Sequence, residues 1–172
     1  SSSHLQNQVS ITPYDLITSI NNTIIIHDHK DNSLYKISAE GKIQTIIRGD
    51  ATSPPILQIS GVCSDSLGNI YAADTIGDKI FKFDKFGAFI TVWGETGSGS
   101  GEFMSPNGLT LIGGKREQIS VCDTGNRRIQ VFDTSGAFLG SYSIAGQKEI
   151  EKKNVILAPT NKTSKQEEIL IL

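Results

Sequence analysis

Residues 27 to 31 read His-Asp-His-Lys-Asp, a cluster whose residue types suit metal binding. In a strand, the imidazoles of His27 and His29 would lie on the same face, where two nitrogen ligands could hold a zinc ion. A zinc site needs three or four ligands, however, and the third histidine, His4, lies in the N-terminal leader. We therefore favour solvated histidines at the edge of a loop, and we expect neither a metal site nor a cofactor.

Nucleophilic catalysis finds no support in the sequence either. There is no Gly-x-Ser-x-Gly motif, and neither Cys63 nor Cys122 has a histidine near it in the repeat described below. Both cysteines lie in strand-like runs without metal-ligand or Cys-x-x-Cys spacing, so two buried reduced thiols are favoured over a disulfide. We expect no catalytic residues.

Four charged residues recur at equivalent places. Asp123 follows Asp74 by 49 positions (123 minus 74), and Arg128 follows Lys79 by the same interval. The favoured interpretation is structural: Asp74 pairs with Lys79, and Asp123 pairs with Arg128, so that each charge pair closes a hairpin. Ligand contact is the alternative.

Arg127 breaks this pattern. Its counterparts are Asp78 in the preceding repeat and Asn32 in the first, so no structural need shared by the repeats explains an arginine. Arg127 is therefore the best single candidate for contact with a partner.

These charges belong to a repeat of 46 to 49 residues. The longer interval also superposes Ile80 on Ile129, and the shorter one superposes Asp28 on Asp74. Three repeats and half of a fourth follow a leader, for which we expect either the remnant of an expression tag or one closing strand. The boundaries are 1–12 for the leader, 13–58, 59–106 and 107–153 for the repeats, and 154–172 for the half repeat.

Each repeat contains four strand signals. In the middle repeat they are GVCSDS, IYAAD, KIFKFD and FITVWG, and glycines between them supply the positive φ that tight turns require. Apolar residues occur on both faces of such a unit, so it must stack on its neighbours. We therefore predict an all-β fold of four-stranded antiparallel blades arranged as in a β-propeller, with a linear solenoid as the alternative.

The segments GNIYAADTIGDKIFKFDKFGAFITVWG and ISVCDTGNRRIQVFDTSGAFLGSY, joined by ETGSGSGEFMSPNGL, resemble NHL repeats. The resemblance covers residues 13–172 and implies a partial NHL-type β-propeller of about three and a half blades. Families with this repeat usually form closed six-bladed rings. They include the C-terminal propellers of tripartite-motif ubiquitin ligases, which bind proteins or RNA, and some enzymes, among them a lyase that holds zinc with histidines.

The resemblance implies a binding platform rather than a reaction. We expect a non-enzymatic module that binds a protein partner, as part of a larger ubiquitin-ligase-type protein. RNA binding is the alternative, and a metal-dependent lyase or a lactonase-type enzyme is less favoured. Loops between second and third strands should emerge on the same face as the connections between blades. The partner-binding candidates on that face are Lys30, Asp31, Asp78, Glu102 and Arg127.

Composition sets further limits. The chain has 37% hydrophobic residues, a formal net charge of -2 and no apolar run near the ~18 residues of a membrane span. The lack of a basic excess argues against dedicated nucleic-acid binding. We expect a cytoplasmic protein without membrane contact. Two aromatic residues, Phe103 and Trp93, are expected to pack between blades rather than to contact a ligand.

Three and a half repeats leave a ring incomplete. Apolar blade faces, with Ile169 and Ile171 among their residues, would remain in water at a cost of ~25 cal/mol per Å². We therefore expect the chain to be a fragment of a longer propeller or to complete its ring with another chain. The favoured version is a homodimer in which each copy contributes three full blades and exchanges half-blades.

Overall fold

The computed structural model describes residues 13–18, 23–114, 116–143 and 149–152, with side chains placed at 13, 23–114 and 116–143. Regular structure in these ranges is β-strand, apart from two short 3-10 turns. The predicted all-β fold is therefore confirmed. None of the described residues forms a helix long and apolar enough to cross a bilayer. The leader 1–12 and the half repeat 154–172 lie outside the described residues.

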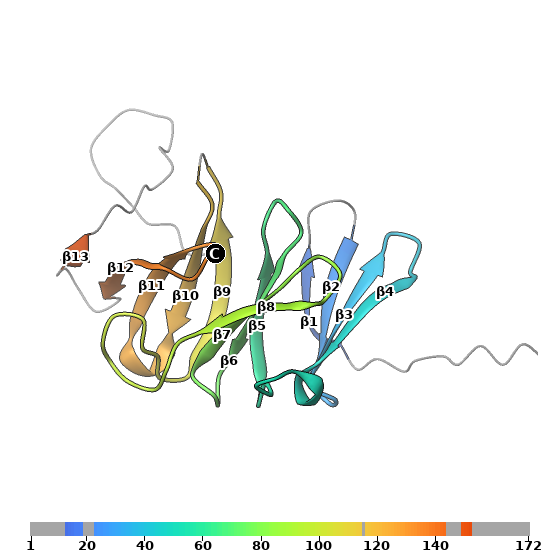
Figure 1. Cartoon of the computed structure of the whole chain (residues 1–172), viewed down its shortest axis with the longest axis horizontal. Helices are drawn as coiled ribbons and strands as arrows, with labels where there is room; N and C mark the ends of the chain where they lie inside the picture. Colours follow the sequence, from blue (N-terminus) through green and yellow to red (C-terminus); the bar gives the residue numbers. More distant parts are fainter. Residues whose placement is uncertain (1–12, 19–22, 115, 144–148, 153–172) are drawn as a thin grey trace, which may run out of the picture.

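The described strands form three antiparallel sheets, which stand side by side in Figure 1. Blade 1 contains β1 (Pro13–Thr18), β2 (Thr23–Asp28), β3 (Ser33–Ser38) and β4 (Ile43–Arg48). Blade 2 contains β5 (Ile59–Ser64), β6 (Ile70–Asp74), β7 (Lys79–Phe83) and β8 (Phe89–Trp93). Blade 3 contains β9 (Pro106–Ile112), β10 (Gln118–Asp123), β11 (Arg128–Asp133), β12 (Phe138–Ser143) and β13 (Glu149–Lys152). The arrangement is that of a partial β-propeller.

Blade 3 differs from the four-stranded unit expected from the sequence because it has a fifth strand. β13 pairs antiparallel with β12, with Tyr142 opposite Glu149 and Ser141 opposite Ile150. The edge of a sheet offers unpaired N–H and C=O groups, so a neighbouring extended segment can add itself as a further strand.

The turns between third and fourth strands show why an aspartate is followed three residues later by a glycine. Asp84 Oδ1 accepts two backbone N–H groups of its turn at 2.8 Å, and Gly87 has a φ of 86°. Asp133 and Gly136, with a φ of 93°, repeat this arrangement in blade 3. A residue with a Cβ would be strained at this φ, so the aspartate and the glycine together fix the turn.

The first strands of blades 2 and 3 approach each other closely. Ser60 Oγ on β5 donates to the carbonyl oxygens of Pro106 and Asn107, each at 3.1 Å. A Cβ at Gly61 would collide with the carbonyl oxygen of Asn107. A glycine is therefore needed where these two backbones meet.

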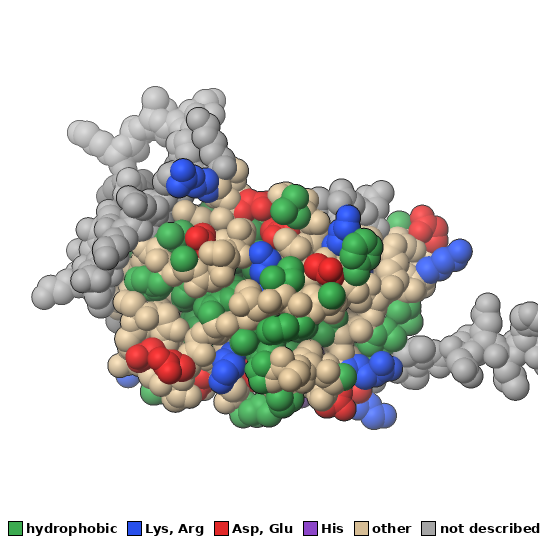
Figure 2. All heavy atoms as spheres, in the orientation of Figure 1, with side chains coloured by type: hydrophobic (Ala, Val, Ile, Leu, Met, Phe, Trp, Pro, Cys, Tyr) green, Lys and Arg blue, Asp and Glu red, His purple; other side chains and the backbone are tan. Residues whose placement is uncertain are grey.

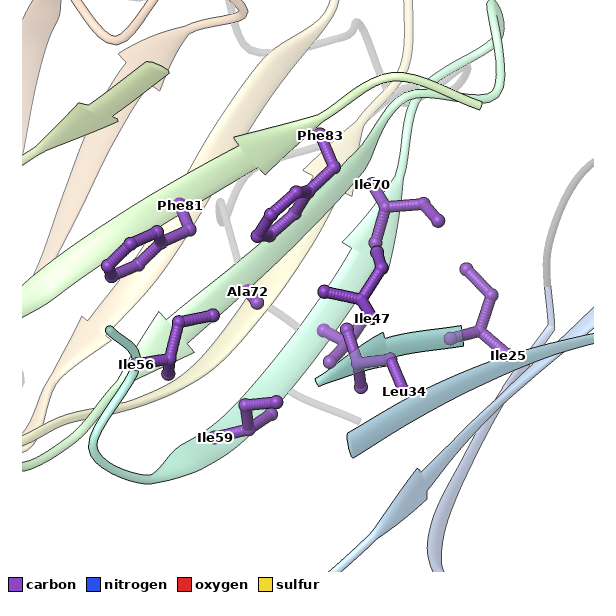
Figure 3. Close-up of a cluster of buried hydrophobic side chains, with 10 residues drawn as sticks. Ile25, Leu34, Ile47, Ile56, Ile59, Ile70, Ala72, Phe81 and Phe83 are labelled. Atoms are coloured by element: carbon purple, nitrogen blue, oxygen red, sulfur yellow. The ribbon is translucent and has the colours of Figure 1, made fainter. Parts of the chain in front are cut away.

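Hydrophobic side chains fill the spaces between the blades. Between blades 1 and 2, Leu34 and Ile47 meet Ile70 and Phe81 in one buried cluster, and Figure 3 shows these side chains gathered between the two sheets. A second cluster joins blades 2 and 3 through Tyr71, Ala73, Ile80, Phe103, Ile119, Val121 and Phe132. Burial of this apolar surface, at ~25 cal/mol per Å², is the main force that stacks the blades.

Phe103 and Trp93 both pack between blades, as predicted. The ring centroid of Phe103, which is fully buried, lies 5.6 Å from that of Phe132. The Trp93 ring lies 5.9 Å from Phe132 of blade 3 and 6.3 Å from Tyr71 of blade 2. These aromatic side chains therefore stabilise the joint between blades 2 and 3.

Candidate functional site

One edge of the molecule collects the loops between second and third strands and the connections that lead from one blade to the next. We call this edge the loop-rich face; it consists of residues 29–32, 49–58, 75–78, 94–105 and 124–127. It lies along the lower edge of Figure 1 and includes the 3-10 turns η1 (Gly49–Ala51) and η2 (Thr124–Asn126). The remaining turns of each blade lie on the opposite face, because neighbouring strands are antiparallel.

A buried ion pair organises this face in blade 3. Asp123, at the end of β10, is fully buried, and Arg128 Nε donates to its Oδ2 at 2.7 Å. The other guanidinium nitrogens of Arg128 donate to the carbonyl oxygens of Ser98, Gly99 and Glu102 at 2.7 to 2.8 Å. The pair expected from the repeat is present, and it also fixes the glycine-rich connection 94–105.

The equivalent pair in blade 2 does not form. The prediction that Asp74 pairs with Lys79 is therefore wrong. The buried Asp74 carboxylate accepts the backbone N–H groups of Leu57 and Gln58 at 2.9 Å and of Gly77 at 3.0 Å. Lys79 Nζ instead donates to the carbonyl oxygen of Gly77 at 3.1 Å. Backbone donors satisfy this carboxylate, and an ammonium lacks the planar fork with which arginine reaches several acceptors.

Asn32 and Asp78 hold each blade to the next. Both have a left-handed backbone, with φ of 50° and 54°. Asn32 Nδ2 donates to the carbonyl oxygen of Ile56 at 2.9 Å, and its Oδ1 accepts the N–H of Ile59 at 2.8 Å. Asp78 Oδ1 accepts the N–H of Ser105 at 2.7 Å. Asp78 was predicted to contact a partner. It is buried instead, and its carboxylate links blade 2 to the connection that enters blade 3, so that prediction is corrected.

Arg127 is the third member of this series. Its φ of 53° shows that all three repeats share a left-handed backbone here, a structural need that the sequence analysis had missed. Asparagine and aspartate adopt this conformation more readily than arginine. The Arg127 side chain is exposed, and within the described part of the chain its guanidinium has no hydrogen-bond or ion-pair partner. It therefore presents its donors to solvent.

The other candidates for partner contact differ in whether their charged groups already form hydrogen bonds within the chain. Asp31 Oδ2 accepts the hydroxyl of Tyr35 at 2.7 Å, and this hydrogen bond raises the pKa of Tyr35 to about 12. Glu102 Oε2 accepts the N–H of Gly99 at 2.7 Å and so stabilises its own loop. The Lys30 side chain is exposed, and its ammonium has no such contact with the described residues.

Three exposed apolar residues on this face were not singled out from the sequence. Leu57, Ile76 and Met104 are 55%, 59% and 44% exposed. Leu57 and Ile76 donate their backbone N–H groups to Asp74 at 2.9 and 3.3 Å, and Met104 donates to Asp123 at 2.8 Å. The two buried aspartates therefore fix the backbone from which these apolar side chains project.

The sequence does contain a signal for two of these residues. Leu57 directly follows Ile56, and Met104 directly follows Phe103; the first member of each pair is buried between blades, and the second is exposed. Figure 2 shows hydrophobic side chains at the lower edge, below β5 and β6, with charged side chains beside them. The loop-rich face therefore combines apolar and charged groups.

The histidines and cysteines correct two further expectations. His27 was expected to be solvated but is 2% exposed, whereas His29 is exposed; their ring centroids lie 6.0 Å apart, edge to face. The described residues contain no group of three potential metal ligands. Both cysteines are free, but only Cys63 is buried; Cys122 is exposed because blade 3 turns it away from blade 2.

Comparison with known proteins supports the repeat architecture. The model of a 6-bladed beta-propeller family matches residues 51–162. The chain is 34% identical over 83 residues to NHL repeat-containing protein 3 of Homo sapiens, covering 46% of this chain and 23% of that protein. These matches confirm the predicted NHL-type propeller.

Two further similarities are to enzymes. Over 74 residues the chain is 38% identical to peptidylglycine alpha-amidating monooxygenase of Rattus norvegicus, covering 40% of this chain and 8% of that protein. The fold matches a streptogramin B lyase with a TM-score of 0.59 and 23% identity, covering 78% of this chain and 41% of the lyase. The chain thus spans less than half of each protein. These similarities overturn the prediction that the chain is not an enzyme, because one enzyme matches part of the chain in sequence and another matches its fold.

Proposed function

Because the chain belongs to the 6-bladed beta-propeller family, we propose that its loop-rich face binds a partner protein. The observation that carries this proposal is the set of apolar side chains held outward by buried carboxylates. Leu57, Ile76 and Met104 are exposed, yet their backbone N–H groups are anchored on Asp74 and Asp123. A preorganised apolar surface loses little conformational entropy on binding, which favours association.

The charges beside these residues favour a partner segment that carries a carboxylate. Asp78 and Glu102 are committed to hydrogen bonds within the chain, and Asp31 accepts from Tyr35. The guanidinium of Arg127 is exposed and unengaged among the described residues. A carboxylate can accept two parallel hydrogen bonds from such a group.

The same face is poorly suited to single-stranded RNA. Such binding relies on exposed aromatic rings that stack on bases, together with a positively charged groove. The described part of the loop-rich face has no exposed phenylalanine, tyrosine or tryptophan; the exposed aromatic side chains Phe86 and Phe89 lie in the β7–β8 turn and in β8. A protein partner is therefore favoured over RNA.

Affinity capture with quantitative mass spectrometry tests the proposal. The chain is used as bait beside two loop-face variants, Arg127→Glu and the double variant Leu57→Ser with Met104→Ser. The matched control is Leu67→Ser, because Leu67 is 74% exposed but lies in the β5–β6 turn on the opposite face. We expect a partner that the wild type and the control retain and that both loop-face variants lose by about tenfold or more, as for hot-spot residues.

Retention of the same partners by both loop-face variants would contradict the proposal, as would equal loss with Leu67→Ser. A fluorescent single-stranded RNA oligonucleotide tests the alternative. Micromolar binding at low salt that weakens steeply as salt rises would assign the face to RNA instead.

A further inference from the structure

The outer strand of blade 2 has an edge with which none of the described strands pairs. β8 pairs with β7 on one side and is the last strand of its sheet on the other. Its sequence, FITVW, consists of aromatic and β-branched residues, without a charge or a proline. Proteins usually protect a sheet edge with charges, prolines or bulges, because its free N–H and C=O groups can pair with another chain. Of these devices β8 has only an irregularity in its pairing at Ile90.

Blade 3 shows that a strand in this position accepts a further strand. β12 is the repeat equivalent of β8, and its pairing with β11 has the same irregularity at Leu139, which stands 49 positions after Ile90 (139 minus 90). β12 nevertheless pairs antiparallel with β13 through residues 140–142. The irregularity therefore does not prevent pairing, and residues 91–93 of β8 occupy the equivalent place.

Two large apolar side chains are exposed on β8. Phe89 and Ile90 are 43% and 47% exposed, and in Figure 2 hydrophobic side chains lie at the surface where β8 crosses the middle of Figure 1. The Phe89 ring is held in place by contacts with Phe81 and Phe83, at 6.4 and 6.2 Å between ring centroids. A strand added at this edge would remove part of this apolar surface from water, which favours association.

The two ends of β8 carry opposite charges. Lys85 lies in the turn before the strand and Glu95 just after its end, and both are exposed. The Lys85 ammonium lies 5.1 Å from the centroid of the Phe86 ring, and neither Lys85 nor Glu95 forms an ion pair with the described residues. Each is five positions from Ile90 (90 minus 85, 95 minus 90). Antiparallel pairing of two identical strands about Ile90 therefore brings Lys85 of each copy toward Glu95 of the other.

From this edge we infer that two copies of this chain associate through their β8 strands, which pair antiparallel across a twofold axis. The contact joins two four-stranded sheets into one of eight strands, a size that open sheets reach. Both copies use the same patch, so the association stops at a dimer. The contact involves none of the apolar residues proposed for partner binding, and it is independent of how the propeller ring is completed.

Sedimentation velocity from micromolar to submillimolar concentration tests this inference. We expect a reversible equilibrium between the 18.6 kDa chain and a species of twice that mass. Ile90→Lys should abolish the dimer, because it places two like charges at the twofold axis. Ile43→Lys is the matched control: Ile43 is 39% exposed and lies on β4, the outer strand of blade 1, so this variant should dimerise as the wild type does.

An exchange of charges provides the sharper test. Lys85→Glu and Glu95→Lys should each weaken the dimer by about tenfold, because like charges then face each other at both ends of the paired strands. An equimolar mixture of the two variants should recover the affinity of the wild type, since every such contact in a mixed pair joins opposite charges. Circular dichroism and the unfolding temperature verify that each variant is folded.

Three results would overturn the inference. They are a wild type that stays monomeric over the whole concentration range, a dimer that survives Ile90→Lys, and a mixture of the charge variants that associates no better than its components. Loss of the dimer through Ile43→Lys, with Ile90→Lys still dimeric, would assign self-association to β4 instead.

Discussion

The guanidinium of Arg128 lies 2.7 Å from the carboxylate of Asp123, and the same guanidinium donates to three carbonyl oxygens of the preceding connection. The side chain of Asp123 is fully buried, and that of Arg128 is 15% exposed. One side chain thus joins a strand end to the connection that leads into blade 3. Among the described residues, the ammonium of the repeat-equivalent Lys79 donates one hydrogen bond, to the carbonyl oxygen of Gly77.

Arg128→Ala is expected to lower the free energy of unfolding by about 3 kcal/mol, because it removes the cationic partner of the buried Asp123 carboxylate and the hydrogen bonds that hold the connection 94–105. Urea unfolding followed by fluorescence measures this change. Lys79→Ala is the matched control and should cost about 1 kcal/mol or less, since it removes a single neutral acceptor contact. Equal effects of the two substitutions would show that the ion pair in blade 3 does not contribute to the free energy of unfolding.

Arg127→Asn is expected to raise the free energy of unfolding by about 1 kcal/mol, because asparagine adopts the left-handed backbone more readily than arginine does. Thermal and urea unfolding, carried out at one protein concentration, measure the gain. The reciprocal change, Asn32→Arg, should instead destabilise the chain by about 1 to 3 kcal/mol, since the contacts with Ile56 and Ile59 are lost. A destabilised Arg127→Asn would show that Arg127 has a structural partner.

The two thiols should differ sharply in reactivity. Burial raises the pKa of Cys63 to about 12, so in the Cys122→Ser variant a thiol reagent at neutral pH should label the protein only after unfolding. In the Cys63→Ala variant, the thiol of Cys122 should be labelled readily in the folded protein, because it is exposed. Rapid labelling of Cys63 in the folded protein would contradict its buried position.

The Tyr35 phenol should make the fold sensitive to alkali. Its hydrogen bond to Asp31 raises its pKa from 10.0 to about 12, so the folded state holds the phenolic proton more tightly than the unfolded state. This contribution to stability is fully present below pH 10 and is lost as the pH rises through about 12. Unfolding measured at increasing alkaline pH should show a smaller loss in Tyr35→Phe than in the wild type.

The effect of Asp31 on the pKa of Tyr35 can also be measured directly. Asp31→Asn should lower the pKa of Tyr35, because it removes the charged acceptor that stabilises the protonated hydroxyl. Titration by phenolate absorbance, with Tyr35→Phe subtracted, isolates this group. An unchanged titration would mean that another interaction sets the pKa of Tyr35.

Strand positions in the middle repeat could be predicted because local chemistry defines them. Alternation between apolar and polar residues in KIFKFD, and glycines such as Gly87 at positive φ, act within a few residues of one another. In the structure, β7 and β8 lie where these patterns indicate. Repetition also predicted the stacking of blades, because each unit is apolar on both faces and needs neighbours on both sides.

The sequence could not decide which polar side chains form hydrogen bonds or ion pairs within the fold. Asp78 and Arg127 occupy the same place in their repeats, yet one is buried in a contact with Ser105 and the other is exposed. Likewise, Asp74 and Asp123 are both buried strand-end carboxylates, but only Asp123 forms an ion pair. These outcomes depend on which backbone N–H groups the next connection brings to each carboxylate. The repeat therefore determined the strands and the blade faces, whereas the tertiary packing of the connections decided which charges remain free to bind.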